Sequence, residues 1–300
     1  MLLTAVFPTT EIGPDPGAIR AWGEGVESLG YKRIMAYDHV LGAVHEGREP
    51  KLWGPYTERD PFHEPMVLFG YFAAVTRSVE LMTGVLVLPQ RQIALVAKQA
   101  IEIDLLSGGR LVLGVGTGWN HVEYEALGTD FRTRAKRLDE QVEVLQLLWN
   151  DALVDFEGRW HRIDRAGLAP RSVRPLPLWF GGSAEPALRR AARLGQGFSF
   201  GTAGQRIIDA RRRLVELLEG AGRDVESFPT EAILHAGKGT DIIAAEAAEW
   251  AAEGGTHLAV STMTSSMLGS AGRSCSGVDQ HLALLETVRD EIHAALARPG

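Results

Sequence analysis

Apolar and polar residues follow two different periods along this chain. Short runs rich in β-branched and other apolar residues predict strands, and the longer segments between them carry apolar residues at helical spacing. Eight predicted strands fall at residues 2–7, 32–37, 79–86, 111–115, 178–181, 197–200, 230–235 and 257–261. Predicted helices include residues 16–29, 65–76, 93–107, 185–194, 205–220, 241–253 and 278–296. Alternating strands and helices build parallel sheets, so eight such units predict a closed α/β barrel, the (β/α)8 TIM barrel.

Three segments do not fit an ideal barrel, and we expect them to be insertions in a single domain over residues 1–300. Residues 42–64 are rich in Gly, Pro and charge, and residues 262–277 are rich in Ser, Gly and Met. Both follow a predicted strand, so they lie on the catalytic face of a barrel as lid or pocket candidates, with a solvated loop as the alternative. Residues 150–176 hold an alternating run around Glu157, which predicts a hairpin outside the barrel.

Composition and charge favour a small-molecule partner. The 300 residues carry a formal net charge of -7, whereas binding to nucleic acid or to an anionic membrane surface needs a basic face. Cys275 is the single cysteine, which excludes an intrachain disulfide and a cysteine zinc cluster and favours a cytoplasmic protein. The N-terminal residues lack the pattern of a signal peptide, and no apolar run reaches the roughly 20 residues of a membrane span.

The sequence YDHV at the end of the second predicted strand carries titratable chemistry, at a position where barrel enzymes place catalytic side chains. His39 can transfer a proton near neutral pH, and Asp38 could fix its tautomer or bond a cofactor edge. A capping aspartate beside a structural histidine is the alternative. His121 and Glu123 follow a later strand on the same face and could also serve, although a solvated helix start explains them equally well.

Two glycine-rich strand ends suggest ligand binding. In LVLGVGTGW, residues 111–119, the spacing fails as a dinucleotide fingerprint because Trp119 stands where its last glycine belongs. A flat ring lying against these glycines is the better functional interpretation, with tight turn packing as the alternative. In LWFGGSAEP, residues 178–186, two glycines and Ser183 precede a helix. Ser183 can cap that helix and its free N–H groups can bind an anion, although an ordinary capped turn has the same sequence.

Five segments together resemble the luciferase-like monooxygenase superfamily, and in particular its coenzyme F420-dependent oxidoreductases. They are YDHV (37–40), TGVLVLPQR (83–91), AKQAIEIDLLSGGRLVLGVGTGW (97–119), RLDEQVEVLQLLW (137–149) and LWFGGSAEPALRRAARLGQGF (178–198). The likeness covers most of the chain and becomes looser after residue 200. It implies a luciferase-like barrel and suggests a homodimer.

The resemblance also implies roles for individual residues. Asp38 and His39 correspond to a pair beside the deazaflavin ring, and a non-prolyl cis peptide behind the ring corresponds to Gly84–Val85 or a bond one or two residues later. The remaining implied cofactor contacts are Gly116, Thr117, Gly118 and Trp119 beside the ring, and Phe180, Gly181, Gly182 and Ser183 at the phosphate. Trp119 stands where some deazaflavin dehydrogenases carry a glutamate as proton donor, and residues 195–197 read GQG where the family has Gly-Asp-Gly.

We therefore expect an F420-dependent oxidoreductase that moves a hydride between the cofactor and a small organic substrate. His39 is the leading acid or base, and Asp38 and Glu123 are further catalytic candidates. An FMN-dependent luciferase-like monooxygenase is the first alternative, and a member that binds cofactor without turnover is another. A non-redox barrel such as an aldolase would need a Schiff-base lysine or a carboxylate pair at strand ends, which the sequence does not offer. No paired metal-ligand spacing occurs, so we expect no metal.

Overall fold

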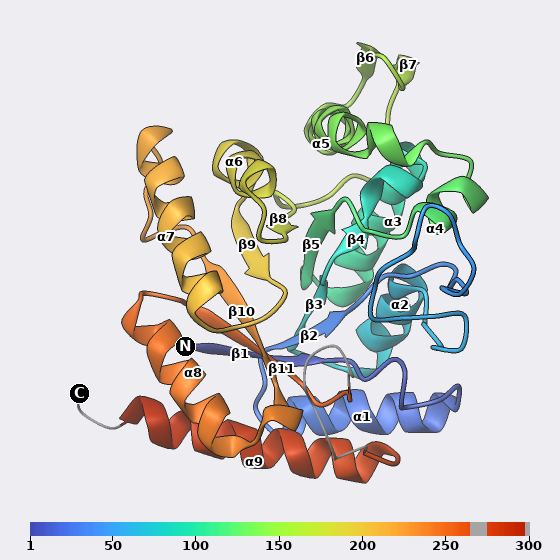
Figure 1. The fold of residues 1–300 in the computed structure, drawn as a ribbon. Coiled ribbons are helices and arrows are strands. Elements are labelled where there is room, and N and C mark those ends of the chain that lie inside the picture. The colour runs from blue at the N-terminus through green and yellow to red at the C-terminus, as the bar shows by residue number, and fades with distance from the viewer. Residues whose placement is uncertain (265–274, 298–300) are drawn as a thin grey trace.

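Eight parallel strand positions close into a barrel in the computed structural model, which describes residues 1–264 and 275–297 (Figure 1). Its strands are β1 (Leu2–Val6), β2 (Arg33–Ala36), β3 (Glu80–Thr83), β4 (Leu86–Val87), β5 (Leu111–Gly116), β8 (Leu178–Gly181), β9 (Gly197–Phe200), β10 (Thr230–His235) and β11 (His257–Ser261). The order β3-β2-β1-β11-β10-β9-β8-β5 closes because β5 also pairs with β3. The predicted TIM barrel is confirmed.

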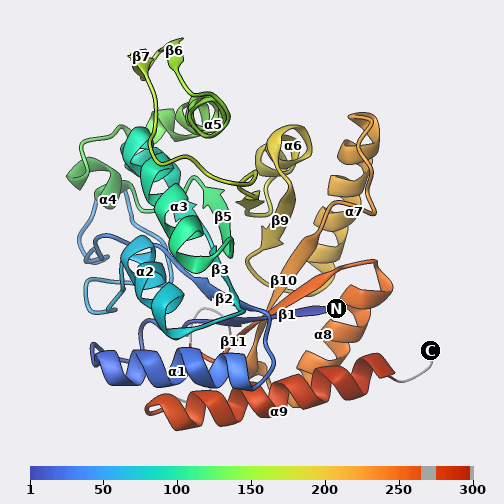
Figure 2. The same ribbon diagram turned by 180° about the vertical axis from the view of Figure 1, so that it is seen from behind.

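Helices surround the barrel on the outside (Figure 2). They are α1 (Pro16–Ser28), α2 (Pro65–Val75), α3 (Ile93–Ser107), α4 (His121–Ala126), α5 (Arg134–Asn150), α6 (Glu185–Leu194), α7 (Gln205–Gly220), α8 (Thr240–Ala252) and α9 (Val278–Ala297), with short 3-10 turns η1 (Leu88–Gln90), η2 (Phe131–Thr133) and η3 (Ala236–Lys238). Their boundaries follow local signals. The Asp15 side chain caps the first N–H groups of α1, and Gly108, at a φ of 71°, ends α3.

The third predicted strand, residues 79–86, is interrupted in the structure. It is divided into β3 and β4, and the peptide bond between Gly84 and Val85 is cis, as the resemblance implies. Neighbouring glycines leave room for the side chain at this break, because a Cβ on Gly116 or Gly181 would lie 2.5 Å from a methyl group of Val85. These two glycines therefore allow close packing around Val85. For Gly116, tight packing is one of the two interpretations of its glycine-rich sequence.

Strand side chains alternate between two apolar cores. One core fills the barrel interior and comprises Val6, Met35, Met82, Val112, Trp179, Ile233, Ala259 and Met263. The other lies between strands and helices and includes Phe180, which is 1% exposed. Because these side chains fill the barrel interior, a ligand can enter only at the end of the barrel where the strand C-termini lie.

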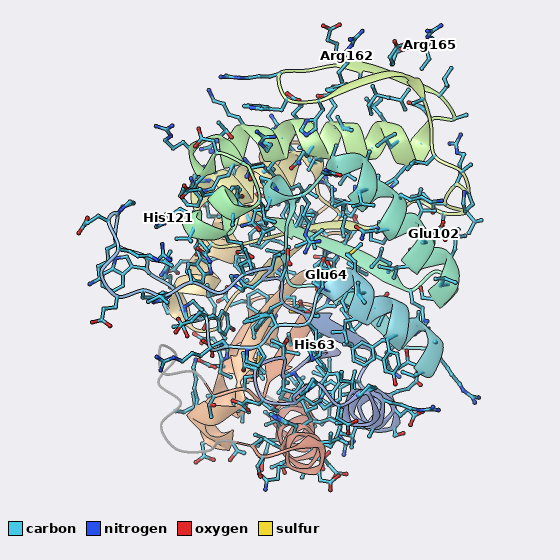
Figure 3. All side chains as sticks on the ribbon, turned by 90° about the vertical axis from the view of Figure 1, so that its right-hand side faces the viewer. His63, Glu64, Glu102, His121, Arg162 and Arg165 are labelled. Atoms are coloured by element: carbon cyan, nitrogen blue, oxygen red, sulfur yellow. The ribbon has the colours of Figure 1, made fainter. Side chains whose placement is uncertain are left out.

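The insertions differ from one another. Residues 151–177 contain the predicted hairpin, formed by β6 (Val154–Glu157) and β7 (Arg162–Ala166). The carboxylate of Glu140 on α5 holds its turn by accepting hydrogen bonds from three backbone N–H groups, each 2.8 Å long. Figure 3 shows this hairpin beyond α5. The segment between β2 and α2 has no regular structure, and most of the predicted 262–277 insertion lies outside the described residues.

Candidate functional site

A cavity of about 390 Å³ lies where the predicted catalytic strand ends meet. Its walls come from the C-terminal ends of β2, β5, β9, β10 and β11, from the break between β3 and β4, from α4 and from the 42–64 insertion. The lining residues are Tyr37, Asp38, His39, Pro55, Tyr56, Gly84, Val85, Val87, Gly118, Trp119, Glu123, Gly201, Ile233, His235, Ser261, Met263 and Thr264. Seven predicted site residues are thus brought to one cavity: Asp38, His39, Gly84, Val85, Gly118, Trp119 and Glu123.

His39 and Glu123 form the central pair of this cavity. The imidazole Nδ1 of His39 lies 3.2 Å from Oε2 of Glu123, and their side chains are 10% and 1% exposed. The other carboxylate oxygen, Oε1, accepts hydrogen bonds from the backbone N–H groups of Val40 and Leu41. Burial alone would raise the pKa of Glu123, but these hydrogen bonds and His39 together lower it below the ordinary value. Glu123 is therefore a buried carboxylate, and its interpretation as part of a solvated helix start is wrong.

The helix that carries Glu123 is fixed at its first turn. Asn120 caps α4, because its side-chain oxygen accepts hydrogen bonds from the N–H groups of Val122 and Glu123, 3.1 and 3.2 Å long. Its amide nitrogen donates to the Leu41 carbonyl at 3.3 Å. Asn120 therefore connects the two segments that carry His39 and Glu123.

Aromatic rings pack around His39. The ring centroids of Phe62, Trp119 and Tyr56 lie 4.9, 5.3 and 5.5 Å from that of the imidazole. Tyr56 and Phe62 belong to the 42–64 insertion, which therefore builds part of the pocket, as one of its two interpretations predicts. The sequence does not single out either ring, because nothing local indicates which side chains of an irregular loop face inward.

Asp38 has a different partner from the one expected. Its carboxylate pairs with Arg91, with 2.6 Å between Oδ1 and a guanidinium nitrogen, and accepts a hydrogen bond from the Val87 N–H at 2.8 Å. Arg91 also pairs with Glu64 at 2.7 Å. Burial raises the pKa of Asp38, although Arg91 and the Val87 N–H oppose the shift. Glu123, rather than Asp38, is thus the carboxylate at hydrogen-bond distance from the His39 ring, and Asp38 joins the ends of β2 and β4.

His235, at the end of β10, is a cavity residue that sequence reasoning missed. Its side chain is buried, and its Nε2 has no hydrogen-bond partner among the described residues. Burial, followed by the positive charge of Lys238, lowers the pKa of His235 to about 4. The ring is therefore neutral near pH 7. The signal available in the sequence was its place at the C-terminal end of a predicted strand.

The remaining predicted residues lie outside the cavity lining. Gly116 ends β5 and Thr117 follows it, whereas Gly181 ends β8 and Gly182 and Ser183 lie in the turn to α6. The side chain of Phe180 is buried in the core between strands and helices. His121 is also on α4, labelled in Figure 3, but lines a different cavity with Phe131. It is not brought to the side of His39.

The turn after β8 differs from the expected capped helix. The N-cap of α6 is Ala184, and no side chain caps its N–H groups, so the expectation that Ser183 caps is wrong. The N-terminus of α7, at Gly204, also lacks a side-chain cap. The Oγ of Ser183 instead accepts a hydrogen bond from Arg206 of α7, 3.2 Å long. Two uncapped helix starts and one arginine therefore provide anion-binding chemistry near the predicted phosphate turn.

The described residues contain no cluster of three or more His, Cys, Asp or Glu side chains suited to a metal ion. Within residues 1–264 and 275–297, no helix has the length and apolar character needed to cross a membrane.

Curated relatives share about a third of their residues with this chain over the matched segments. An uncharacterised protein of Mycobacterium tuberculosis is 37% identical over 178 residues, which are 57% of this chain and 60% of the relative. An F420-dependent glucose-6-phosphate dehydrogenase of Nakamurella multipartita is 31% identical over 188 residues, or 61% of this chain and 51% of that enzyme. The chain thus spans about half to three fifths of the length of these relatives.

Solved structures with the same fold include an F420-dependent enzyme and a monooxygenase. An F420-dependent secondary alcohol dehydrogenase in complex with an F420–acetone adduct has a TM-score of 0.74 and 15% identity, covering 97% of this chain and 98% of that one. The monooxygenase RslO1 from Streptomyces bottropensis has a TM-score of 0.75 and 17% identity, covering 99% and 100%. At these identities the likeness concerns the fold. Residues 1–299 match the family described as luciferase-like monooxygenase, and the chain belongs to that family of oxidoreductases and monooxygenases.

Proposed function

We propose that this protein is an F420-dependent oxidoreductase that transfers a hydride between the deazaflavin cofactor and a small organic substrate. The observation that carries the proposal is the pair of His39 and Glu123, joined at 3.2 Å in the cavity at the strand C-termini. Such a pair can deliver or remove the proton that accompanies hydride transfer at a carbon–oxygen bond.

The residues at the barrel mouth fit a flavin-type cofactor. Val85 and Gly118 line the cavity together with the flat ring of Trp119, so they would contact a planar ring system. Arg206, Ser183 and the uncapped N–H groups of α6 would hold a phosphate. When bound, the deazaflavin ring supplies hydride transfer, and the protein supplies binding, orientation and exclusion of water.

Glu123 determines which nitrogen of His39 is available for chemistry. Its pKa is lowered, so it is ionised near neutral pH and accepts the Nδ1 proton of His39. The Nε2 atom is then the nitrogen that exchanges a proton with the substrate. The carboxylate also stabilises the imidazolium that forms when Nε2 takes up a proton, so Glu123 is a positioning residue for His39 rather than a second acid.

An FMN-dependent monooxygenase is the second candidate. It is supported by the family to which the chain belongs and by the fold shared with RslO1. The same glycine-rich strand end and phosphate turn would serve FMN, so cofactor binding and oxygen dependence discriminate between the two.

Substitution of His39 tests the proposed role. Because one fold neighbour is a secondary alcohol dehydrogenase, we would screen secondary alcohols as hydride donors to F420 and follow loss of the absorbance of oxidised F420. With an active donor, His39→Ala should bind F420 as the wild type does and lose turnover by about 10² to 10⁴. His121→Ala, on α4 but outside this cavity, is the control and should retain turnover. A His39→Ala enzyme that keeps full turnover would overturn this assignment.

We also propose, from the resemblance and from cysteine usage, that the chain forms one domain over residues 1–300, assembles as a homodimer and works in the cytoplasm on a small-molecule substrate without a nucleic-acid or membrane partner.

A further inference from the structure

The imidazole of His235 is a buried polar group with unused hydrogen-bonding capacity. It lines the cavity at the end of β10 and is 4% exposed. Its Nε2 has no hydrogen-bond partner among the described residues. A buried polar atom without a partner destabilises the site, so a ligand that satisfies this ring gains affinity from it.

The charge state of the cavity limits what that ligand can be. Burial and the charge of Lys238 lower the pKa of His235 to about 4, although a hydrogen bond to the Gly201 backbone acts in the opposite direction. The ring therefore carries no positive charge near pH 7. Lys238 itself is paired with Glu246 at 2.6 Å. Glu123 adds a carboxylate to the cavity wall. An anionic group beside His235 would thus meet a neutral ring in a cavity that already holds negative charge, which disfavours it.

The walls beside His235 favour an apolar body on the ligand. Ile233 lies two positions before it on β10, and Met263 and the ring of Tyr56 line the same cavity. A neutral imidazole has one donor and one acceptor nitrogen, and a hydroxyl group can both donate and accept. A hydroxyl therefore suits this ring in either tautomer.

We propose that His235 is a specificity-determining residue that binds the hydroxyl group of a neutral, largely apolar substrate, and selects it over carboxylates and phosphates. This inference rests on the proposed function, since it takes the barrel-mouth cavity as the substrate site. It deepens that function by naming an alcohol as the substrate class.

Ligand binding to the full chain labelled with ¹⁵N-histidine tests the proposal without turnover. The probes are benzyl alcohol, ethylbenzene, in which a methyl group replaces the hydroxyl, and benzoate, in which a carboxylate replaces the whole hydroxymethyl group. The imidazole signal of the wild type that is absent in His235→Phe belongs to His235. Titrations with each probe, with and without F420, give the dissociation constants of the probes. His235→Gln keeps a polar group, and His293→Gln, on the exposed face of α9, is the control.

Benzyl alcohol should shift the His235 signal and bind about tenfold more tightly than either other probe. His235→Phe should lose this preference, His235→Gln should keep part of it, and His293→Gln should keep all of it. A preference that survives in folded His235→Phe, or a His235 signal that benzyl alcohol leaves unmoved, would overturn the proposal. Failure of F420 to bind, with the preference intact, would instead contradict the proposed function alone.

Discussion

Glu123 keeps a negative charge in an almost fully buried position because several donors converge on its two oxygens. The N–H groups of Val40 and Leu41 and the imidazole of His39 all lie more than 80 positions away in the sequence. Charge-assisted hydrogen bonds of this kind offset the loss of solvation that burial causes. The carboxylate thereby holds the backbone after β2 as well as the ring of His39.

Glu123→Gln should reveal this arrangement in stability as well as in catalysis. The folded-state pKa of Glu123 is lower than the ordinary 4.5, so its ionisation stabilises the fold above about pH 5, and that stability is lost as pH falls through the folded-state pKa. The variant should lose about 1 to 3 kcal/mol of unfolding free energy at pH 7 and show a weaker pH dependence below pH 5, measured by urea denaturation. Glu125→Gln, exposed on the same helix, should behave as the wild type. If Glu123→Gln showed the same dependence of unfolding free energy on pH as the wild type, Glu123 would not stabilise the fold in its ionised form.

For single residues, the sequence predicts a place in the pocket only where the residue directly follows a predicted strand. The position of His39 after a strand was enough to expect it in the pocket. The burial of Glu123 and the pairing of Asp38 with Arg91 depend on contacts between segments 84 and 53 positions apart. No local pattern encodes such contacts, nor the direction in which the ring of His235 points. Their chemistry had to come from the assembled barrel.

At the level of elements, the Asp38–Arg91 ion pair connects the end of β2 to the chain after β4. Asp38 is 1% and Arg91 13% exposed, so Asp38→Asn leaves a buried guanidinium with one carboxylate partner fewer. We expect a loss of about 3 kcal/mol in unfolding free energy. Glu24→Gln removes the exposed pair with Arg20 and should change the unfolding free energy little, because exposed ion pairs contribute little. Equal losses in urea denaturation would show that the buried pair contributes no more than a surface pair.

The contribution of the turn from β8 to α6 to cofactor binding can be tested at Arg206. Arg206→Ala removes the guanidinium beside Ser183 and should weaken F420 binding about tenfold to a hundredfold, because hydrogen bonds to charged groups contribute more than neutral ones. Arg212→Ala, exposed on the same helix, is the matched control. Substitution of Gly182 is a poorer test, since its φ of 131° strains any other residue. Unchanged fluorescence titrations with Arg206→Ala would remove this turn from the cofactor site.

Elements were more predictable than residues. All eight barrel positions matched apolar runs in the sequence, because strands in a closed parallel barrel are buried on both faces. The exception was the third run, where apolar character continues through Thr83 and Leu86 although the strand is interrupted at Gly84 and Val85. Hydrophobicity alone does not register such a break, and only the family resemblance indicated it.

For the whole molecule, the barrel explains why residues from distant segments share one cavity. Parallel strands all end at the same face, so β2, β5, β10 and β11 deliver His39, Trp119, His235 and Ser261 to one place. The strand count and their order along the chain were sufficient to predict this convergence. The identity of the cofactor is not set by the barrel, since the same fold occurs in an F420-dependent dehydrogenase and in a monooxygenase.

Titration of the purified protein with F420 and, separately, with FMN tests whether the barrel cavity is an F420 site. Dissociation constants would come from cofactor fluorescence, with thermal shift as a second readout of the same binding. We expect saturable F420 binding at least about tenfold tighter than that of FMN, with a matching rise in the unfolding temperature. Tight binding of FMN with no binding of F420 would contradict it and assign the cavity of His39 and Glu123 to flavin chemistry instead.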